Sequence, residues 1–363
     1  MKIQAAVSRE GARHPQIEAV EIEDPRPGEI LVRIIASGIC HTDIGVHGRP
    51  GPRPFVLGHE GAGIVERIGP GVTDLAPGDH VVLSVNFCGE CPSCRRNAHS
   101  YCYEVLPRNF GGLRPDGSSP LSQNGARIFA RFFGQSSLAT YSLADARCAI
   151  KVPADIPLEI LAPLGCGVQT GAGSIIHSLR VGAGDSVAIF GVGAVGLAAV
   201  MAARLVGAER IIAVDLVPSR LALAKEHGAT DTIDASAGDA VKIIRDLTRH
   251  GVSHSFNTAN APIAYTQSLA CLAPRGVAGF VAPPRAEWAP DMFHLLSGGR
   301  ALRGILGGDT TPSLFIPMLI DYYRQGRFPF DRLIKFYAFD QIAQAFDDSS
   351  SGRTIKPVLR MPS

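Results

Sequence analysis

Residues 186–215 read SVAIFGVGAVGLAAVMAARLVGAERIIAVD, and this stretch decides the fold. Its apolar run at 186–190 predicts a buried strand, and residues 195–206 predict the helix that follows. A G-x-G-x-x-G pattern joins the two and consists of Gly191, Gly193 and Gly196. Such glycines permit a tight turn and let a pyrophosphate approach the N-terminus of the helix. The stretch therefore predicts a dinucleotide-binding unit.

Asp215 ends the next predicted strand, nineteen residues past Gly196. An acidic side chain at this place hydrogen-bonds the adenosine ribose hydroxyls and repels a 2′-phosphate. We therefore expect NAD rather than NADP as the coenzyme. The alternative for the glycine pattern is a turn without a ligand, and the strand–turn–helix context argues against it.

The segments around this stretch repeat its alternation of strand and helix. From Pro153 onward, apolar strands alternate with helices, which is typical of a parallel sheet covered by helices on both faces. The alternating segments are 186–190, 195–206, 210–214 and 219–226. We therefore expect an α/β fold with a Rossmann-type doubly wound parallel sheet, as an NAD-binding domain over residues 156–294.

Short strands and turns dominate the remainder of the chain. Examples of these strands are residues 30–35, 61–68 and 80–85. The same character returns after about residue 295, and a Gly-, Pro- and Ser-rich segment at 108–124 reads as a surface loop. We expect a mostly β catalytic domain made of residues 1–155 and 295–363, into which the NAD-binding domain is inserted.

The composition bounds the domain count and the partners. A chain of 363 residues exceeds one average core, so two domains are expected. Lys and Arg number 35 against 33 Asp and Glu, and this balance gives no reason to expect a nucleic acid or an anionic membrane as partner. The uncharged run at 186–203 has the length of a membrane span, but its glycine pattern favours a buried strand plus helix.

Cysteine usage points to metal. The N-terminus shows no signal-peptide pattern, so we expect a cytoplasmic protein, in which eight cysteines are metal ligands more often than disulfides. Four of them, spaced C-x2-C-x2-C-x7-C, are Cys88, Cys91, Cys94 and Cys102. Four thiolates within fifteen residues can enclose one tetrahedral Zn²⁺. The alternatives are packed thiols or an iron–sulfur cluster, although the last spacing differs from that of bacterial ferredoxins.

A second group of candidate ligands is spread along the chain. Cys40 and His59 lie in the short motifs CHTD and GHE, and Cys166 lies in LGCGVQT. Two thiolates and one imidazole leave the fourth position of a zinc ion open, which a catalytic site requires. Glu60 could approach such a metal during ligand exchange, and Asp43 could orient His59.

Together these motifs resemble the zinc-containing medium-chain alcohol dehydrogenases, over nearly the whole chain and in the same order. GHEGAG at 58–63 is shared across that family. Three other stretches resemble its aryl-alcohol, or benzyl-alcohol, dehydrogenases, and they are FGQSSLATY at 133–141, LGCGVQTGAG at 164–173 and FPFDRLIKFYAF at 328–339. The resemblance implies a GroES-like fold for the mostly β domain.

The resemblance also assigns roles to single residues. It implies a catalytic zinc on Cys40, His59 and Cys166, and a structural zinc on the four clustered cysteines. Thr42 matches the hydroxyl that relays the proton of the alcohol, and a hydroxyl that only caps a helix is the alternative. Coenzyme contacts are implied for His41 at the pyrophosphate, Thr170 and Val195 at the nicotinamide, Arg220 at the adenosine ribose and Lys356 at the pyrophosphate. For the last two, a solvated surface cation is an open alternative.

Two places depart from the family pattern. Gly45 stands where many members end the proton relay in a histidine. His47 is an alternative end, although we favour a histidine of a solvent-exposed loop there, with bulk water or His41 completing the relay. The run Asn257-Thr258-Ala259-Asn260 replaces a common acidic residue and glycine, and we have no functional account of it. Two further cysteines lack partners at metal spacing and are expected to be packed thiols, namely Cys148 and Cys271.

The expected reaction is oxidation of a primary aromatic alcohol to its aldehyde, with hydride transfer to NAD⁺ and Thr42 accepting the proton. Alternatives are the same chemistry on a terpene or allylic alcohol, such as geraniol or perillyl alcohol, or on a thiol–aldehyde adduct. A non-catalytic zinc- and NAD-binding redox sensor is an alternative of another class, and the open metal site argues against it. The resemblance further implies a homo-oligomer, a dimer or, as we favour, a tetramer, with residues 301–307 as a pairing edge strand.

Overall fold

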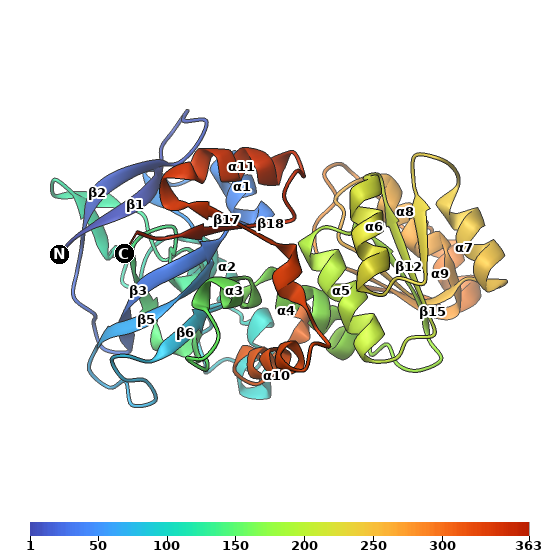
Figure 1. The fold of residues 1–363 in the computed structure, drawn as a ribbon, viewed down its shortest axis with the longest axis horizontal. Helices are drawn as coiled ribbons and strands as arrows, with labels where there is room; N and C mark the ends of the chain where they lie inside the picture. The colour runs from blue at the N-terminus through green and yellow to red at the C-terminus, as the bar shows by residue number, and fades with distance from the viewer. Residues whose placement is uncertain (363) are drawn as a thin grey trace. The chain divides into compact units, whose positions relative to one another are not determined.

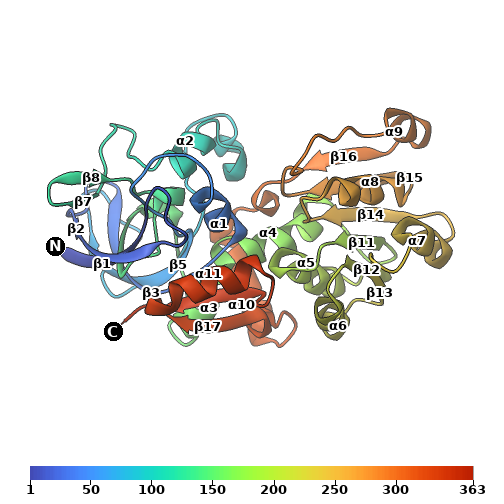
Figure 2. The same cartoon turned by 90° about the horizontal axis from the view of Figure 1, so that it is seen from above.

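The computed structural model describes residues 1–362, which form two compact units (Figures 1 and 2). Unit 1 combines Met1–Cys166, Thr311–Ile320 and the segment from Asp331 onward. Unit 2 combines Gly167–Thr310 and Asp321–Phe330. In sequence, unit 2 is therefore an insertion between segments of unit 1.

The unit boundaries differ from the expected domain boundaries, which lay after residues 155 and 294. Residues 156–166 contain α3 (Leu158–Leu161) and the short helix η5 (Ala162–Gly165), and both pack against strands of unit 1. At the other end, β16 (Ala301–Gly304) pairs with the last long strand of unit 2. Tertiary packing, which no local pattern records, therefore sets both boundaries.

Unit 2 is built on a six-stranded parallel sheet with the order β13-β12-β11-β14-β15-β16. The strands are β11 (Ser186–Phe190), β12 (Arg210–Asp215), β13 (Asp231–Asp234), β14 (Val252–Asn257), β15 (Leu272–Phe280) and β16. The central strands β11 and β12 are buried along almost their whole length, as parallel strands covered on both faces must be. The strand order is that of a doubly wound dinucleotide-binding sheet, so the predicted fold class is confirmed.

Helices cover both faces of this sheet (Figure 1). They are α5 (Ala194–Leu205), α6 (Pro218–His227), α7 (Ala240–Thr248), α8 (Pro262–Ala270) and α9 (Met292–Gly298). Helices α5 and α6 pack together, and α7 packs on α8 and buries Ala240 and Ile244 in a core shared with β11 and β12. The uncharged run at 186–203 is thus a buried strand followed by a helix. Within the described residues, no helix has the length and hydropathy of a membrane span.

Unit 1 is mostly β. A five-stranded sheet has the order β4-β1-β2-β7-β8, with bounds Phe55–Val56, Lys2–Ser8, Gln16–Ile22, Leu121–Gln123 and Ala126–Ile128. A seven-stranded sheet has the order β10-β6-β5-β3-β18-β17, with β9 also paired to β3. Its bounds are Ala149–Lys151, His80–Leu83, Glu60–Ile68, Glu29–Gly38, Lys356–Arg360, Ile334–Ala338 and, for β9, Tyr141–Asp145. The pairs are antiparallel except β17 with β18, which is typical of a fold closed by hairpins and meanders.

Two expectations about unit 1 were wrong. The region after residue 295 contains helices as well as strands, namely α10 (Pro312–Arg324) and α11 (Ile342–Ser350). Pro317 inside α10 hides a helical pattern in which Phe315, Ile316, Leu319 and Ile320 are buried. Residues 108–124 are not a plain surface loop either, because Arg114 is buried and bonded to Glu29 of β3.

Candidate metal and coenzyme sites

Three candidate ligands come from segments at the ends of elements in unit 1. Cys40 follows β3 and is the N-cap of α1 (His41–His47), with an extended backbone at φ −114° and ψ 157°. His59 lies between β4 and β5, and Cys166 follows η5. With the adjacent Glu60, their ligand atoms lie within 4.8 Å of one another. The structure thus brings together residues that are far apart in sequence and could hold one metal ion.

Asp43 joins two of these ligands. Its buried carboxylate accepts hydrogen bonds from the backbone N–H of Cys40 at 2.9 Å and of Gly58 at 3.0 Å. The same carboxylate lies 3.0 Å from Nδ1 of His59. A proton on Nδ1 leaves Nε2 as the free ligand atom, which is the arrangement that orients a metal-binding histidine. The geometry is the one expected of Asp43.

The chemistry of the donor set fits a zinc ion. Nε2 of His59 is buried and has no hydrogen-bond partner among residues 1–362. The Cys166 thiol, and then His59, hold the pKa of the Cys40 thiol well below its usual range. Burial opposes a charge on His59, but Asp43 and Cys40 still raise its pKa well above the usual value. Two thiols and an imidazole packed in this way offer the nitrogen and sulfur ligands that zinc prefers.

Glu60 has a buried cation as partner. Nζ of Lys356 donates to Oε1 and Oε2 of Glu60 at 2.8 and 2.9 Å, and to the carbonyl of Ile39 at 3.3 Å. Burial raises the pKa of Glu60. Lys356 is only 3% exposed, so it is not the solvated surface cation that we considered, and its ammonium lies on Glu60 rather than on an open phosphate site. We call Cys40, His59, Glu60 and Cys166 the metal group, and Lys356 neutralises the carboxylate within it.

Thr42 is placed beside the first cysteine. Its hydroxyl lies 3.8 Å from the Cys40 sulfur. The first turn of α1 is capped by the Asp43 carboxylate on the N–H of Cys40 instead. A role for Thr42 as the cap of this helix is therefore wrong, and its hydroxyl stays at the metal group.

His47 does not lie in a solvent-exposed loop, contrary to expectation. It is the last residue of α1 and is half-buried. Its Nδ1 lies 2.5 Å from the hydroxyl of Ser8, and its ring packs edge-on against Phe346 of α11 at 5.9 Å. The ring therefore connects α1 to β1 and α11.

An aromatic cluster lies against His59. The ring of Phe133 stacks on the imidazole, with centroids 4.5 Å apart and planes 25° apart. Phe132 meets the same imidazole edge-on at 5.4 Å, and Phe110 packs against both phenylalanines. Phe110 is 38% exposed, so the cluster combines buried rings with an apolar surface beside the candidate ligands.

The four clustered cysteines also converge. Their sulfur atoms lie within 4.8 Å of one another. Backbone N–H groups donate to three of them, from Cys88 to Cys102, from Cys91 to Cys88 and from Cys94 to Cys91, at 3.3 to 3.5 Å. A backbone hydrogen bond at Tyr103 lowers the pKa of the Cys91 thiol to about 6. Such bonds stabilise thiolates, so this group too could hold a zinc ion.

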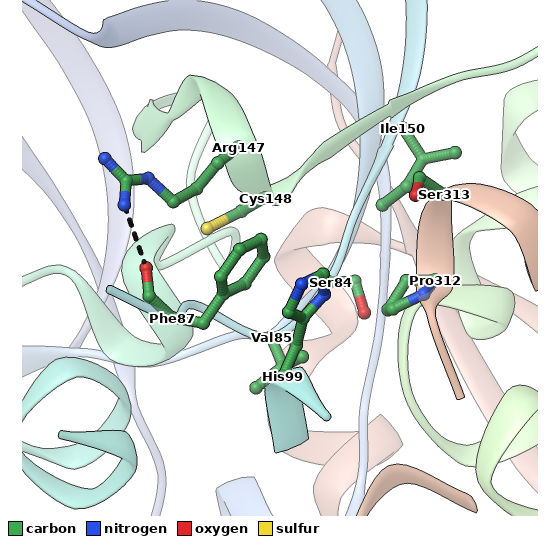
Figure 3. A pocket seen from close by; sticks show the side chains of 9 residues that line it. All are labelled: Ser84, Val85, Phe87, His99, Arg147, Cys148, Ile150, Pro312 and Ser313. Atoms are coloured by element: carbon green, nitrogen blue, oxygen red, sulfur yellow. Dashed lines mark hydrogen bonds between the residues drawn. The ribbon is translucent and has the colours of Figure 1, made fainter. Parts of the chain in front are cut away.

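A small pocket of unit 1 lies beside the segment of the four clustered cysteines (Figure 3). The rings of Phe87 and His99 stack in it at 3.8 Å, and Arg147 donates to the carbonyl of Phe87 at 3.3 Å. The buried Cys148 also lines it. None of the candidate catalytic ligands is among the residues that line this pocket.

The two remaining cysteines are packed thiols, as expected. Cys148 and Cys271 are free and buried. Burial raises the pKa of both thiols, that of Cys271 to about 12.

The glycine pattern of unit 2 separates into two kinds of position. Gly191 has a φ of +82°, and a Cβ on Gly196 would lie 2.0 Å from the carbonyl oxygen of Gly191. The fold itself therefore requires both glycines. A Cβ on Gly193 would have nothing within 4 Å. This glycine leaves an open space at the N-terminus of α5, which suits an approaching phosphate group.

Asp215 ends β12 next to this turn. It accepts hydrogen bonds from the N–H of Val192 at 2.7 Å, Leu216 at 2.8 Å and Val217 at 3.0 Å. Arg220 lies 3.9 Å away, and its Nε is buried without a hydrogen-bond partner in the described part of the chain. Asp215 thus holds the glycine turn through the N–H of Val192.

Two further predicted coenzyme residues lie on neighbouring helices of unit 2. Thr170 belongs to α4 (Gly167–Gly173) and Val195 to α5. These helices pack so closely that a Cβ on Gly171 would lie 2.0 Å from the carbonyl of Val195. His41, by contrast, is an exposed residue of α1 in unit 1.

Sequence reasoning missed two residues that contact the metal group. One is Lys356 as the partner of Glu60, and the other is Gln135, whose amide bonds the backbone of His59. Gln135 lies in one of the stretches that resemble the aryl-alcohol subgroup, and this resemblance is the sequence signal that could have identified the residue. Neither contact has a local pattern, because each joins segments far apart in the chain.

Comparison with known proteins gives a consistent result. The model of the alcohol dehydrogenase GroES-like domain matches residues 26–154, and that of the zinc-binding dehydrogenase matches residues 194–321. A geraniol dehydrogenase of Castellaniella defragrans is 46% identical over 98% of this chain and 97% of its own length.

Solved structures agree over the whole chain. An alcohol dehydrogenase zinc-binding domain protein from Burkholderia ambifaria is 50% identical, with a TM-score of 0.98 and full coverage of both chains. The benzyl alcohol dehydrogenase of Acinetobacter calcoaceticus is 43% identical, with a TM-score of 0.96 and full coverage of both chains. Taken with the two converging ligand groups, these matches show that the chain belongs to the zinc-dependent medium-chain alcohol dehydrogenases.

Proposed function

We propose that this dehydrogenase oxidises primary alcohols whose hydroxyl-bearing carbon adjoins an aromatic ring or a double bond, with NAD as the coenzyme. The observation that carries the proposal is the convergence of Cys40, Cys166 and the buried His59, with aromatic rings packed against His59. Benzyl-type alcohols are the first substrate class, and terpene alcohols such as geraniol are the second.

We assign the catalytic zinc to Cys40, His59 and Cys166, and the structural zinc to the four clustered cysteines. Three protein ligands leave one position for the substrate, whereas four thiolates close a site. When bound, zinc polarises the alcohol oxygen and NAD accepts the hydride.

The chain's own residues prepare this chemistry. Asp43 keeps the His59 imidazole in the tautomer that presents Nε2. The Thr42 hydroxyl, 3.8 Å from the Cys40 sulfur, accepts the proton of the alcohol and passes it to solvent. The Phe132 and Phe133 rings exclude water from one side of His59.

Unit 2 supplies the coenzyme contacts in this proposal. The turn of Gly191, Gly193 and Gly196 receives the pyrophosphate at the N-terminus of α5. Asp215 and Arg220 hold the adenosine ribose, and Thr170 and Val195 stand beside the nicotinamide. The open space at Gly193 and the Nε of Arg220, which has no hydrogen-bond partner among residues 1–362, support this assignment.

The substrate class rests on an apolar surface and on two relatives. Phe110 and Phe133 give that surface beside the metal group. The relatives named above act on geraniol and on benzyl alcohol, which share an unsaturated carbon next to the hydroxyl-bearing carbon. Conjugation stabilises the aldehyde product of either class.

A panel of alcohols tests the proposal, with NADH formation as the readout. If an aryl or prenyl group buries roughly 100 Å² more apolar area than ethanol does, the gain is about 2.5 kcal/mol, or nearly a hundredfold in kcat/KM. We therefore expect benzyl, cinnamyl and perillyl alcohol and geraniol to exceed ethanol by about that factor. A tenfold advantage of geraniol over benzyl alcohol would make terpene alcohols the first class. Ethanol turnover equal to that of benzyl alcohol would refute the substrate class, and zinc and NAD binding without any turnover would favour a redox sensor.

A further inference from the structure

The side-chain amide of Gln135 is hydrogen-bonded to the backbone of the segment that carries His59. The side chain is 2% exposed, and its Oε1 accepts from the backbone N–H of Gly61 at 3.1 Å. Its Nε2 donates to the carbonyl of His59 at 3.1 Å and to that of Ser84 at 3.4 Å. One amide therefore holds the backbone on both sides of Glu60 and connects it to the end of β6.

The close approach of this amide depends on a residue without a side chain. A Cβ on Gly61 would lie 3.0 Å from Oε1 of Gln135 and 2.6 Å from Cβ of Ser137. The segment of His59 and the turn of Gln135 are thus packed backbone against side chain, with no room for a Cβ on Gly61.

The turn that carries Gln135 is conformationally strained. Arg131, Phe133 and Ser136 have φ values of +71°, +51° and +62°, a backbone conformation that residues other than glycine rarely adopt. Such conformations persist where surrounding contacts hold them, and they concentrate at functional sites. Ser136 provides one such contact, because its hydroxyl donates to the carbonyl of Val56 at 2.6 Å.

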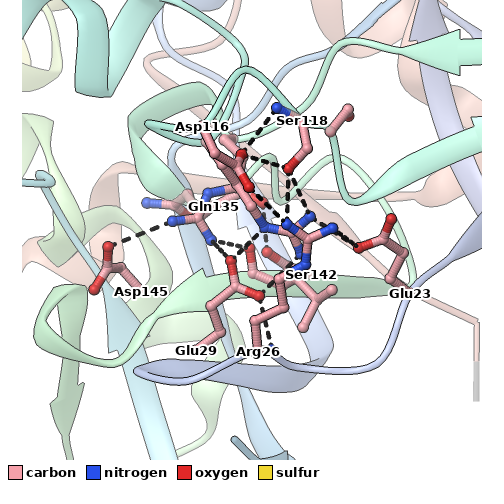
Figure 4. A network of polar contacts seen from close by, with 12 residues as sticks. Glu23, Arg26, Glu29, Asp116, Ser118, Gln135, Ser142 and Asp145 are labelled. Carbon is pink, nitrogen blue, oxygen red and sulfur yellow. Dashed lines mark hydrogen bonds and ion pairs between the residues drawn. The ribbon is translucent and has the colours of Figure 1, made fainter.

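A buried polar network supplies the other contacts (Figure 4). Ser142 donates to the carbonyl of Gln135 at 2.5 Å. The Arg131 guanidinium donates to Glu29 at 3.1 Å and to the carbonyl of Leu143 at 3.2 Å. Glu29 is held in turn by Arg114 at 2.7 and 2.9 Å. This network fixes the strained turn through Arg131 and Gln135.

We infer that Gln135 is a positioning residue for the catalytic zinc. Asp43 orients the ring of His59 through Nδ1, whereas Gln135 fixes the backbone from which that ring and the Glu60 side chain project. Both constraints are needed to keep Nε2 of His59 in place relative to the two thiols. The inference rests on the proposed function, because it assumes that His59 binds zinc.

Two substitutions test this role. Gln135→Met keeps the volume and removes all three hydrogen bonds. Gln135→Glu keeps the shape and the bond from Gly61, but a carboxylate cannot donate to the carbonyls of His59 and Ser84. Gln135→Glu keeps the side-chain shape and decides the test if Gln135→Met does not fold.

Asn109 offers a matched control. It is fully buried, its Oδ1 accepts from the N–H of Asn86 at 2.9 Å, and its Nδ2 donates to the carbonyls of Asn86 and Val105 at 2.9 and 2.7 Å. Asn109→Asp therefore makes the same amide-to-acid change in a side chain that also hydrogen-bonds backbone N–H and carbonyl groups, on a different segment of unit 1.

The readout is zinc release from the whole protein into excess chelator, followed together with residual activity. We expect both Gln135 variants to release the zinc that is linked to activity about tenfold faster than the wild type, because loss of an outer contact of a metal ligand typically weakens metal binding by at least that factor. The release rate of the other zinc should be unchanged. A changed visible spectrum of the Co²⁺-substituted catalytic site should accompany the faster release. Asn109→Asp should leave the release of the activity-linked zinc at the wild-type rate.

Other outcomes overturn the inference. These are equal acceleration for both zinc ions, release within about twofold of wild type, or failure of both Gln135 variants to fold while Asn109→Asp folds. Each would reduce Gln135 to a general contribution to stability. If the wild-type protein releases no zinc in step with its activity, the proposed function itself fails instead.

Discussion

At the scale of single residues, Asp215 has two tasks that a mutational test must separate. Its carboxylate holds the glycine turn through the N–H of Val192, and it stands where the coenzyme ribose is proposed to bind. A change to glycine would remove both functions. Asp215→Asn keeps the shape and one acceptor oxygen, so it removes the negative charge together with either the bond from Val192 or the bonds from Leu216 and Val217.

We expect Asp215→Asn to raise kcat/KM with NADP relative to NAD by about tenfold or more. Two like charges about 4 Å apart cost between ~1 and ~4 kcal/mol, depending on their exposure, and the change removes this repulsion of the 2′-phosphate. Arg220, 3.9 Å from Asp215, then becomes available to that phosphate. Steady-state kinetics with both coenzymes give the ratio.

Asp234 provides the control, because it ends the neighbouring strand β13 and accepts hydrogen bonds from Ser236. Asp234→Asn should leave the coenzyme ratio unchanged. Equal efficiency of NAD and NADP in the unmutated protein would show that Asp215 does not read the ribose.

At the scale of elements, the buried pair of Glu29 and Arg114 ties residues 108–124 to β3. We expect Arg114→Met to lower the free energy of unfolding at neutral pH by about 3 kcal/mol, because it leaves a buried carboxylate short of a partner. Urea unfolding measures the change. Arg67→Met breaks an exposed pair with Asp24 and should cost less than about 1 kcal/mol.

The same pair predicts a dependence on pH. Burial opposes the charge of Glu29, but Arg114 and Arg131 outweigh it and lower its pKa. A lowered pKa in the folded state gives stability that is present above the ordinary glutamate pKa and is lost as pH falls through the lowered value. The destabilisation by Arg114→Met should therefore shrink in acid, below a pH of about 4. A constant difference between pH 7 and pH 3 would contradict this account of the pair.

The edge strand β16 predicts association. It pairs with β15 on one side and ends the sheet of unit 2, while the neighbouring α9 exposes Phe293 at 77% and Leu296 at 81%. Exposed edges and apolar patches are normally covered. We expect a homo-oligomer by light scattering, and weaker association when Phe293 and Leu296 are changed to glutamate.

Leu106→Glu is the control for this prediction, because Leu106 is 67% exposed on α2 (Val105–Phe110) in unit 1. It should leave the association unchanged if pairing uses β16 and α9. A wild-type protein that is monomeric at micromolar concentration would exclude the pairing.

The elements show which parts of the structure the sequence could predict. The strand at 186–190 and the helix that follows the glycine turn have local patterns, and both were predicted nearly to the residue. Helix α10 was missed because Pro317 interrupts its pattern. The ligand groups were predicted because metal binding demands particular residue types. The contacts of Gln135 with His59 and of Lys356 with Glu60 were not, since an amide or a lysine has no signature until the fold brings its partner close.

At the scale of the whole molecule, we expect two zinc ions per chain. Cys166→Ser should lose one zinc and all activity while the unfolding temperature stays close to that of the wild type, because an open site contributes chemistry rather than closure. Cys94→Ser should lose the other zinc and lower that temperature. Elemental analysis with thermal unfolding gives both results.

Cys271→Ala is the control, because this buried thiol lies outside both ligand groups and should retain both zinc ions. A single zinc in fully active protein would contradict the assignment of two sites.

The insertion of unit 2 has a consequence for the order in which the protein is made. Strand β3 pairs with β18, and Glu60 forms an ion pair with Lys356, which lies 296 residues further along the chain. The ribosome therefore completes the long segment of unit 2, Gly167–Thr310, before it makes β17 and β18. Because such distant contacts form slowly, Glu60 acquires its charge-balancing lysine only after the long segment of unit 2 has been made. During translation, the nascent chain carries a complete nucleotide-binding sheet and an unfinished catalytic centre.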